Sequence, residues 1–309
     1  MASAPQPVCL RQGPLELQCL PGLGACCAAL RHHSGNGAPA TDILRPLPAG
    51  DCDPFASGFF AMVPYANRLF GQVLQSDGQG PRQIALNRAG VPHPVHGVGW
   101  MQPWQVVRSS PAALQLAYER APDAHWPFAH GAAMDIRLSA QALRIELALH
   151  NRSQEPMPAG MGFHPWLMAE RDAELRFDAQ HVWRQDATGL PLERIAPAQD
   201  AQLDCAHGRL VHGLDLNHCY ASWCGTAELR RPSAGLRVQL RASADQGHLQ
   251  VYRPPGQPWV CVEPQSHATG AFSLPACHLP VHGVRWLAPG ATMRAWIEVT
   301  VAGSAVPAA

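Results

Sequence analysis

Residues 259–272 read WVCVEPQSHATGAF and combine a strand pattern with a reactive side chain. Trp259, Cys261 and Glu263 alternate with valines, which predicts a β-strand that carries these three side chains on one face. Glu263 precedes Pro264, and a residue before proline is held in an extended conformation. The strand therefore delivers a carboxylate at a fixed position, just before the polar residues QSH. A β-scaffold can present a general base in this way, and the alternative interpretation is a surface Glu beside a proline turn.

The same alternation of apolar and polar residues recurs along the chain. Period two with one polar face is typical of antiparallel sheets that bury one side. Helical patterns are scarce, and the 30 prolines agree with that. The sequence predicts an all-β, mostly antiparallel β-sandwich that forms a single domain over residues 1–309, with its core at about 15–301. The predicted strands include residues 15–20, 114–118, 134–138, 143–149, 175–177, 236–240, 249–252 and 293–299.

Composition excludes several classes of function. The 309 residues have a formal net charge of zero and a pI near 7.3, so no nucleic-acid footprint or basic membrane patch is present. The chain contains no Lys, which excludes Schiff-base chemistry on a lysine, including that of pyridoxal enzymes. The N-terminus lacks the pattern of a secretory signal, and no apolar run reaches the length of a membrane span. We therefore expect a cytoplasmic protein with no nucleic-acid or membrane partner.

Metal and cofactor motifs are also missing from the sequence. The 10 cysteines match no zinc spacing, and no HxH or HExxH pair occurs. Nucleotide-binding glycine fingerprints and a GxSxG elbow are absent too. We expect no metal and no cofactor. Free thiols are expected in a reducing cytoplasm, while the even cysteine count leaves disulfides open.

Four further stretches place polar residues among aromatic residues and prolines. Asn67 and Arg68 offer directional donors, and an Arg fork suits adjacent oxygens. His96 precedes a glycine and lies near two tryptophans, a combination that can face a sugar ring and its hydroxyls. His164 precedes a proline, as Glu263 does, and can exchange a proton near neutral pH. The fourth stretch, residues 213–220, offers a carboxylate, an amide and an imidazole. Each stretch alone could equally be a turn, a strand edge or a packed loop with a structural histidine.

Taken in order, these stretches resemble the aldose 1-epimerase (galactose mutarotase) family, and the match is closest to its shorter bacterial members. The resemblance implies a twisted β-supersandwich with a sugar in an open cleft, and cofactor-free interconversion of α and β anomers. The pieces that carry it are DILRP at 42–46, PYANRL at 64–69, HGVGW at 96–100, GFHPWL at 162–167, HCYASWCG at 218–225 and CVEPQSHATGAF at 261–272.

The resemblance also implies roles for individual residues. Glu263 would be the general base that takes the proton of the anomeric hydroxyl, and His164 the general acid that protonates the ring oxygen. We expect the two groups on opposite sides of the C1–O5 unit, spaced to straddle a pyranose, with His164 protonated and Glu263 ionised. Asn67, Arg68 and His96 would hold the sugar.

One position departs from the family pattern. Where the family usually has an Asp immediately before a His, this chain has Asn217, and Asp215 lies two positions earlier. Either residue could hold a sugar hydroxyl, so both are candidates for substrate binding.

Two alternative functions stay open on the same fold. A hexose-6-phosphate 1-epimerase would need extra cations, for which Arg68, Arg82 and Arg88 are candidates. A non-catalytic carbohydrate-binding or sensing protein would keep the cleft without turnover, although binding alone needs no acid–base pair. In every case the expected partner is a monosaccharide, and we expect a monomer or a homodimer.

Overall fold

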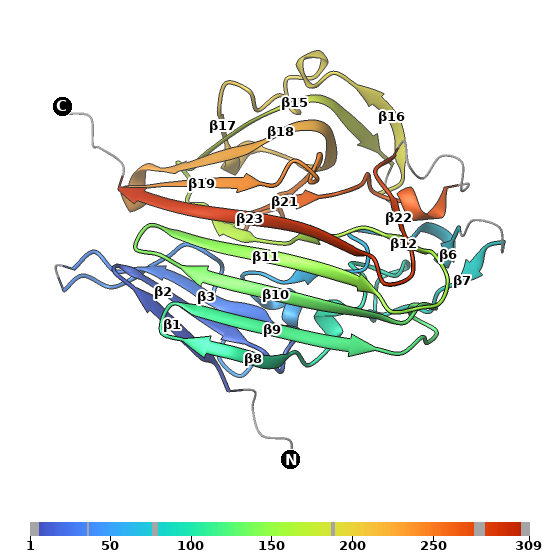
Figure 1. Cartoon of the computed structure of the whole chain (residues 1–309). Coiled ribbons are helices and arrows are strands. Elements are labelled where there is room, and N and C mark those ends of the chain that lie inside the picture. The colour runs from blue at the N-terminus through green and yellow to red at the C-terminus, as the bar shows by residue number, and fades with distance from the viewer. Residues whose placement is uncertain (1–5, 36, 76–79, 187–188, 275–281, 304–309) are drawn as a thin grey trace.

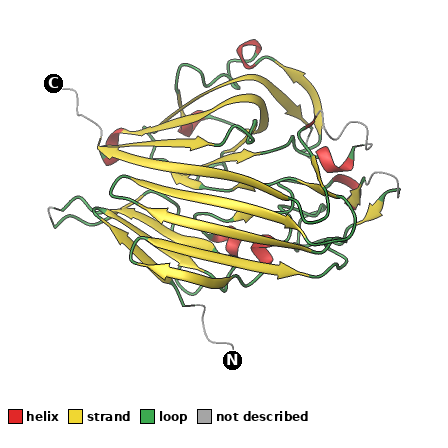
Figure 2. Cartoon of the chain, viewed as in Figure 1, coloured by secondary structure: helices red, strands yellow, loops and turns green. Residues whose placement is uncertain are grey.

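The computed structural model describes residues 6–35, 37–75, 80–186, 189–274 and 282–303. Antiparallel strands dominate these residues, which confirms the all-β prediction (Figures 1 and 2). The helices among the described residues are short 3-10 turns, and none of them is long and apolar enough to cross a membrane. These turns are η1 (Pro54–Ala56), η2 (Phe70–Gln72), η3 (Gly99–Met101), η4 (Pro197–Gln199), η5 (Val211–Gly213), η6 (Pro232–Ala234) and η7 (Ala271–Ser273).

A large sheet of 15 strands forms most of the molecule. Its main path runs β5-β13-β21-β20-β18-β19-β23-β11-β10-β9-β8, with β14 paired to β21 and β15 paired to β16, β17 and β18. The strands are β5 (Ala61–Met62), β8 (Gln105–Ser110), β9 (Ala113–Arg120), β10 (His130–Leu138), β11 (Ala142–Asn151), β13 (Gly162–Phe163), β14 (Trp166–Met168), β15 (Glu174–Gln185), β16 (Pro191–Ile195), β17 (Arg209–Leu210), β18 (Asn217–Arg231), β19 (Leu236–Ala242), β20 (His248–Tyr252), β21 (Trp259–Gln265) and β23 (Thr292–Gly303).

Three smaller sheets complete the described fold. Four strands near the N-terminus form a meander that lies behind β8 to β11 in Figure 1. The other two sheets are two-stranded. The meander consists of β1 (Val8–Gln12), β2 (Leu15–Leu20), β3 (Cys26–His32) and β4 (Thr41–Asp42), and the pairs are β6 (Val73–Leu74) with β7 (Arg82–Gln83) and β12 (Met157–Ala159) with β22 (Arg285–Leu287).

The core lies between these layers, as the alternation in the sequence predicts. In β9, Leu114, Leu116 and Tyr118 are buried while the residues between them are partly exposed, and β11 and β23 follow the same rule over most of their length. Buried apolar side chains of the meander and of the large sheet join in one continuous cluster. Burying a side chain such as Leu114 contributes about 1.5–3 kcal/mol, which fixes the strand register because a slip by one residue would expose the whole set.

Strands β20 and β21 break this rule, and they carry the polar centre of the molecule. Both are buried on the two faces along most of their length. Gln250, Glu263 and Gln265 are therefore buried polar residues, each at most 2% exposed. Burying unpaired polar groups is costly, so a cluster of them in a large core needs internal partners or a ligand.

The cysteines of the described residues carry no disulfide. All nine of them are free, and six are buried. A reduced set of mostly buried thiols agrees with the expectation of free cysteines.

Candidate active site

The strand pairing of β21 brings His164 to Glu263. Two short strands flank His164 and both pair with β21: Gly162 lies opposite Gln265, and Trp166 lies opposite Cys261. Glu263 is centred between those two partners on β21. His164 therefore lies beside Glu263 on the neighbouring strand segment. Its backbone N–H donates to the carbonyl of Phe60 (3.1 Å). Two residues about 100 positions apart in the sequence become neighbours through this register.

The imidazole and the carboxylate are in direct contact. Nε2 of His164 lies 3.4 Å from Oε1 of Glu263, and the two side chains are 6% and 3% exposed. The His164 ring stacks on Phe60 with centroids 4.4 Å apart and an interplanar angle of 22°. It also meets His96 edge-on at 4.8 Å. The two groups lie side by side, so the expected arrangement with a pyranose between them is wrong.

Burial acts against the expected charge state of the pair. Desolvation raises the pKa of Glu263 to about 8, against a smaller lowering by the Cys261 thiol and the Arg68 guanidinium. Desolvation likewise lowers the pKa of His164 to about 3, and Arg45 lowers it further. Burial therefore favours a carboxylic acid beside a neutral imidazole in the resting pair. The ion pair that the sequence suggested contains the same number of protons and differs only in the position of one proton.

The second carboxylate oxygen of Glu263 is left without a partner. Oε2 is buried and has no hydrogen bond among the described residues. A buried oxygen of this kind is uncommon in a folded protein and is a natural acceptor for a ligand hydroxyl. The carboxyl thus offers one oxygen to His164 and holds the other available.

Asn67 and His96 hold one another in an unusual backbone conformation. Both have φ of 58°, the left-handed region that non-glycine residues rarely adopt. The N–H of Asn67 donates to Nδ1 of His96 (3.1 Å), and the N–H of His96 donates to the carbonyl of Asn67 (2.9 Å). Desolvation lowers the pKa of His96 well below its usual value, so this imidazole is neutral. Because Nδ1 accepts, Nε2 carries the proton and is a donor beside His164.

Gly97 makes this arrangement possible. Its φ is 66°, and a Cβ atom there would lie 2.0 Å from the carbonyl oxygen of Val63. Only glycine allows the backbone to approach Val63 so closely. The HG dipeptide of the sequence is thus a packing requirement that places His96.

Gln250 links the sugar-binding candidates, although its sequence context does not mark it as a site residue. Its Oε1 accepts from Nδ2 of Asn67 (3.2 Å) and from the hydroxyl of Thr269 (3.3 Å), and its Nε2 donates to Oδ1 of Asn217 (2.9 Å). Nη1 of Arg68 lies 3.4 Å from Oδ1 of Asn67 and extends the chain of contacts. The alternation in residues 249–252 suggested a solvent-facing Gln, and no local signal shows that this face is covered.

A small cavity gathers three of the predicted binding residues. Its volume is about 190 Å³. Asn217 joins the hydrogen-bonded chain through Gln250, whereas Asp215 is exposed at the cavity wall. Of the two alternatives at the position that departs from the family pattern, Asn217 is the better connected. The cavity is lined by Arg68, Gln185, Asp186, Gly189, Asp215, Asn217 and His218.

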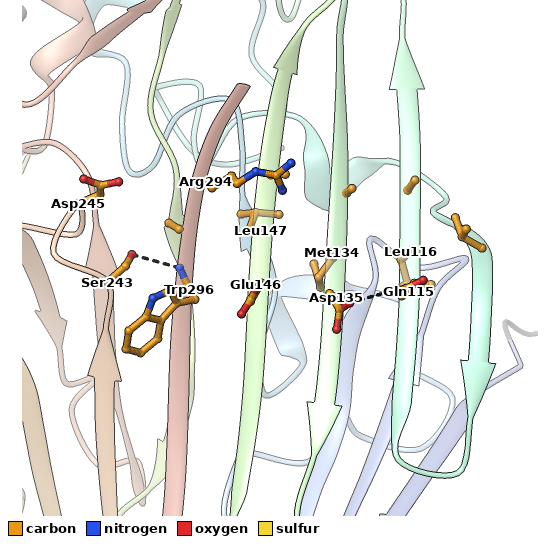
Figure 3. Close-up of a pocket in the computed structure, with 15 residues that line it drawn as sticks. Gln115, Leu116, Met134, Asp135, Glu146, Leu147, Ser243, Asp245, Arg294 and Trp296 are labelled. Carbon is orange, nitrogen blue, oxygen red and sulfur yellow. Dashed lines mark hydrogen bonds between the residues drawn. The ribbon is translucent and has the colours of Figure 1, made fainter. Parts of the chain in front are cut away.

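A larger groove of about 690 Å³ lies elsewhere, across strands β9, β10, β11 and β23 (Figure 3). None of the predicted site residues lines it. Two of its polar side chains are paired with each other, since Gln115 donates to Asp135 (2.8 Å, Figure 3). Glu146 accepts from Arg144 (2.9 Å). The guanidinium of Arg144 also lies over the ring of Trp296, 4.1 Å from its centroid. Volume alone would select this groove, but the reactive groups lie at His164 and Glu263.

Among the described residues, one cluster could bind a cation. His96, His164 and Glu263 each offer a ligand atom, and these atoms lie within 4.8 Å of one another. Ligands at 2.0–2.1 Å from a tetrahedral Zn²⁺ are about 3.3 Å apart, so these three groups would have to close up to hold an ion. Their present spacing includes the 3.4 Å contact between His164 and Glu263.

Comparison with known proteins identifies the family. The sequence profile described as aldose 1-epimerase matches residues 20–300, so the chain belongs to the aldose 1-epimerase family. An Escherichia coli K12 crystal structure, described provisionally as an aldose 1-epimerase, has a TM-score of 0.85 at 23% identity and covers 96% of this chain and 99% of that one. A galactose mutarotase-like protein from Clostridium acetobutylicum has a TM-score of 0.85 at 19% identity, covering 98% and 97%.

The sequence comparison finds a similar relative whose function is open. The uncharacterised Escherichia coli K12 protein YphB is 25% identical over 235 residues, which is 74% of this chain and 79% of that protein. The structures confirm the galactose mutarotase-like fold that the resemblance implied.

Proposed function

We propose that this protein is an aldose 1-epimerase that interconverts the α and β anomers of a free aldose by general acid–base catalysis. The observation that carries the proposal is the contact between His164 Nε2 and Glu263 Oε1 at 3.4 Å, beside a buried carboxylate oxygen that lacks a partner. Membership of the family supports an epimerase, and the pair supplies the two proton-transfer groups that the reaction needs.

The side-by-side geometry suits the atoms that react. O1 and O5 of a pyranose are both bonded to C1, so a base for one and an acid for the other can reach these neighbouring atoms from the same side. The ionised carboxyl of Glu263 takes the proton of the O1 hydroxyl, the O1 lone pair forms the C1 carbonyl, and the C1–O5 bond breaks. Nε2 of His164 gives its proton to O5. Rotation about C1–C2 and the reverse transfers then close the other anomer.

The proton balance connects this reaction to the resting state. Ring opening begins with a carboxylate and an imidazolium, and it ends with a carboxylic acid and a neutral imidazole. The pair carries the same number of protons throughout. A sugar hydroxyl that donates to Oε2 of Glu263, together with the Arg68 guanidinium, would favour the carboxylate over the resting acid.

The surrounding residues are proposed to hold the sugar. Nε2 of His96 is a donor next to His164, and the guanidinium of Arg68 acts on Glu263. Asn67 and Asn217 are joined through the amide of Gln250, which pairs with Glu263 across β20 and β21. Asp215 lines the cavity from its exposed side. Hydroxyl groups of a sugar need such directional donors and acceptors, while an apolar sugar face needs rings such as Phe60.

The arrangement of arginines favours a free sugar over a phosphorylated one. Arg82 pairs with both oxygens of Glu155 (3.0 and 3.1 Å), and Arg88 pairs with both oxygens of Asp53 (2.8 and 3.0 Å). Of the three arginines that the sequence offered, Arg68 alone lines the cavity, where Asp186 and Asp215 also lie. A phosphate group would meet two carboxylates for one guanidinium, which makes a hexose-6-phosphate the weaker candidate.

We further propose that the protein acts in the cytoplasm as a monomer or homodimer, without a metal or other cofactor. Free thiols support a reducing compartment.

The direct test is anomer relaxation measured by polarimetry or one-dimensional NMR. Freshly dissolved α-glucose and α-galactose are followed with and without the protein, with glucose 6-phosphate and galactose 6-phosphate in parallel. Faster relaxation of a free sugar supports the proposal. Relaxation of only the phosphate esters would favour the phosphate-specific alternative, and saturable sugar binding without faster relaxation would favour the sensing alternative.

A further inference from the structure

His267 is a buried histidine that the reaction described so far does not use. It follows β21 in the stretch WVCVEPQSHATGAF and is 1% exposed. Its Nε2 accepts a hydrogen bond from the backbone N–H of Ala66 (3.0 Å), and its Nδ1 lies 2.9 Å from the carbonyl oxygen of Ala268. His267 therefore connects the segment after β21 to the PYANRL segment, 201 positions earlier in the chain.

The two contacts assign one tautomer to His267. A ring nitrogen that accepts a hydrogen bond carries no proton, so in the neutral ring Nδ1 carries the proton and donates to the Ala268 carbonyl. Burial lowers the pKa of His267 to about 3, against a smaller opposite effect of the Ala268 carbonyl. Both ring nitrogens thus have a partner in the neutral form that burial favours.

Ala66 immediately precedes two residues that are proposed to bind the sugar, Asn67 and Arg68. The next backbone N–H, that of Asn67, donates to Nδ1 of His96 (3.1 Å), so two imidazoles accept from consecutive N–H groups. Asn67 has a φ of 58°, a conformation that an Asn rarely holds without support from its surroundings. The directions in which the side chains of Asn67 and Arg68 leave the backbone therefore depend on both acceptors.

Close packing holds the His267 ring in place. A Cβ atom at Gly160 would lie 2.3 Å from Cδ2 and 2.7 Å from Nε2 of His267, so only glycine leaves room for the ring. The N–H of Gly160 donates to the carbonyl of Pro64 (2.8 Å), which ties the same backbone to the PYANRL segment. On another side the ring meets Phe272 edge-on, with centroids 4.7 Å apart. The acceptor Nε2 is thereby kept at Ala66.

We infer that His267 is a positioning residue for sugar binding: its Nε2 holds the backbone at Ala66 and thereby sets the directions of the Asn67 and Arg68 side chains. Ala66 is fully buried, so its N–H would be left unpaired without this acceptor, and the segment would have to shift to satisfy it. Such a shift would disturb the contact of Asn67 with Gln250. The inference deepens the proposed function and rests on it for the effect on sugar affinity.

NMR of the ligand-free protein tests the contact and its effect on Asn67. In ¹⁵N-labelled protein, an N–H···N hydrogen bond gives a scalar coupling between its two nitrogens, here the amide of Ala66 and Nε2 of His267. We expect this coupling in the wild type, with Nδ1 of His267 protonated. His267→Leu should lose the coupling and shift the side-chain amide signals of Asn67. Neither result requires turnover of a sugar.

Steady-state kinetics of anomer relaxation tests the consequence for binding. His267→Leu removes the acceptor, so KM should rise about tenfold while kcat stays within about threefold of the wild type. In His267→Gln, Oε1 occupies the same place along the side chain as Nε2 and can accept from Ala66, so KM should return to within about threefold of the wild type. The side chain of His267→Asn ends one atom short of that place, so KM should stay high. The Gln and Asn variants decide the question if His267→Leu does not fold.

His130→Leu is the matched control. His130 is also 1% exposed and has partners at both ring nitrogens, the Phe128 carbonyl and the Tyr118 hydroxyl (3.1 Å each), but it lies at the start of β10. Loss of these bonds should lower the melting temperature and leave both KM and the Asn67 signals unchanged. A purely structural role of His267 would give this same result in its own variants.

Three results would overturn the inference. They are a wild-type protein without the coupling between Ala66 and His267, a folded His267→Leu enzyme with KM within about twofold of the wild type, and a His267→Gln enzyme with KM as high as that of His267→Asn. If no sugar is bound or epimerised, the proposed function fails, while the coupling and the Asn67 signals still decide whether His267 positions this segment.

Discussion

Gln250 lies directly opposite Glu263 in the antiparallel pairing of β20 with β21. Gln250 is 2% exposed, as is Glu263, and its amide connects Asn67 on one side with Asn217 on the other. Asn67 lies outside the strands in a left-handed conformation, and Asn217 is the first residue of β18. Strand pairing alone therefore does not hold either side chain in place. The geometry of the proposed sugar-binding groups depends on this buried amide.

Gln250→Leu should therefore weaken substrate binding more than turnover. The substitution keeps the volume of the side chain but leaves the amides of Asn67 and Asn217 without their shared partner. We expect KM to rise about tenfold, with a smaller decrease in kcat, in an anomer-relaxation assay. Gln239→Leu on the neighbouring part of the sheet is the control, and it should change neither constant. A Gln250→Leu enzyme with unchanged KM would remove Gln250 from the binding network.

The pH dependence of kcat/KM should show an alkaline decline. In the enzyme without substrate, the pKa is about 3 for His164 and about 8 for Glu263. At a pH between these two values, His164 and Glu263 together hold one exchangeable proton. Activity requires that proton, so kcat/KM should be level from pH 5 to 7.5 and decrease as pH rises through about 8. A profile that instead declines between pH 7 and 5, as for a free histidine, would contradict the neutral resting pair.

Arg68 should influence the pH at which kcat/KM decreases on the alkaline side. Its guanidinium lowers the pKa of Glu263, in opposition to burial. Arg68→Met removes this attraction, so the alkaline limb of kcat/KM should move to higher pH, alongside weaker sugar binding. Arg88→Met tests the effect of lost positive charge elsewhere, because Arg88 is paired with Asp53. An alkaline limb that stays in place in Arg68→Met would show that this guanidinium does not act on Glu263.

Glu263→Gln should stabilise the fold at alkaline pH. The carboxyl has a pKa of about 8 in the folded chain against an ordinary 4.5, so its stabilising protonation is complete below pH 4.5 and lost as pH rises through 8. The amide of the Glu263→Gln variant does not titrate, so it loses no stability as the pH rises. The melting temperature of the variant should thus equal that of the wild type near pH 5 and exceed it by several degrees at pH 8.5, since about 1 kcal/mol corresponds to roughly 2–4 °C in a large domain.

Calorimetry over that pH range checks this prediction. A melting-temperature difference that is independent of pH would mean that Glu263 is not buried as an acid. Glu146→Gln, at an exposed carboxylate of β11, provides the comparison.

Much of the fold was predictable because one face of most strands is solvated. The alternations at residues 114–118, 143–149 and 293–299 lie within β9, β11 and β23, where polar residues do face outward. At β20 the same rule failed for Gln250, because other segments cover both faces there. Local periodicity cannot report what packs on a strand from distant parts of the chain.

The sequence predicted which residues lie together at the site, but it did not predict their protonation states. The structure brings together His164, Glu263 and His96, and it places Asn67 and Arg68 beside them. The catalytic and binding roles of these residues remain predictions. The sequence suggested an ion pair, whereas burial favours the neutral form of each group. A pKa depends on the depth of burial, which a motif does not contain.

Anomer exchange in Glu263→Gln and His164→Asn tests the central claim most directly. Two-dimensional exchange NMR at equilibrium gives the interconversion rate of α- and β-sugar, and line broadening or calorimetry gives sugar binding by the same samples. Each variant should exchange anomers about 10²–10⁴-fold more slowly than the wild type while it still binds the sugar. Exchange at the wild-type rate in either variant would contradict proton transfer by this pair.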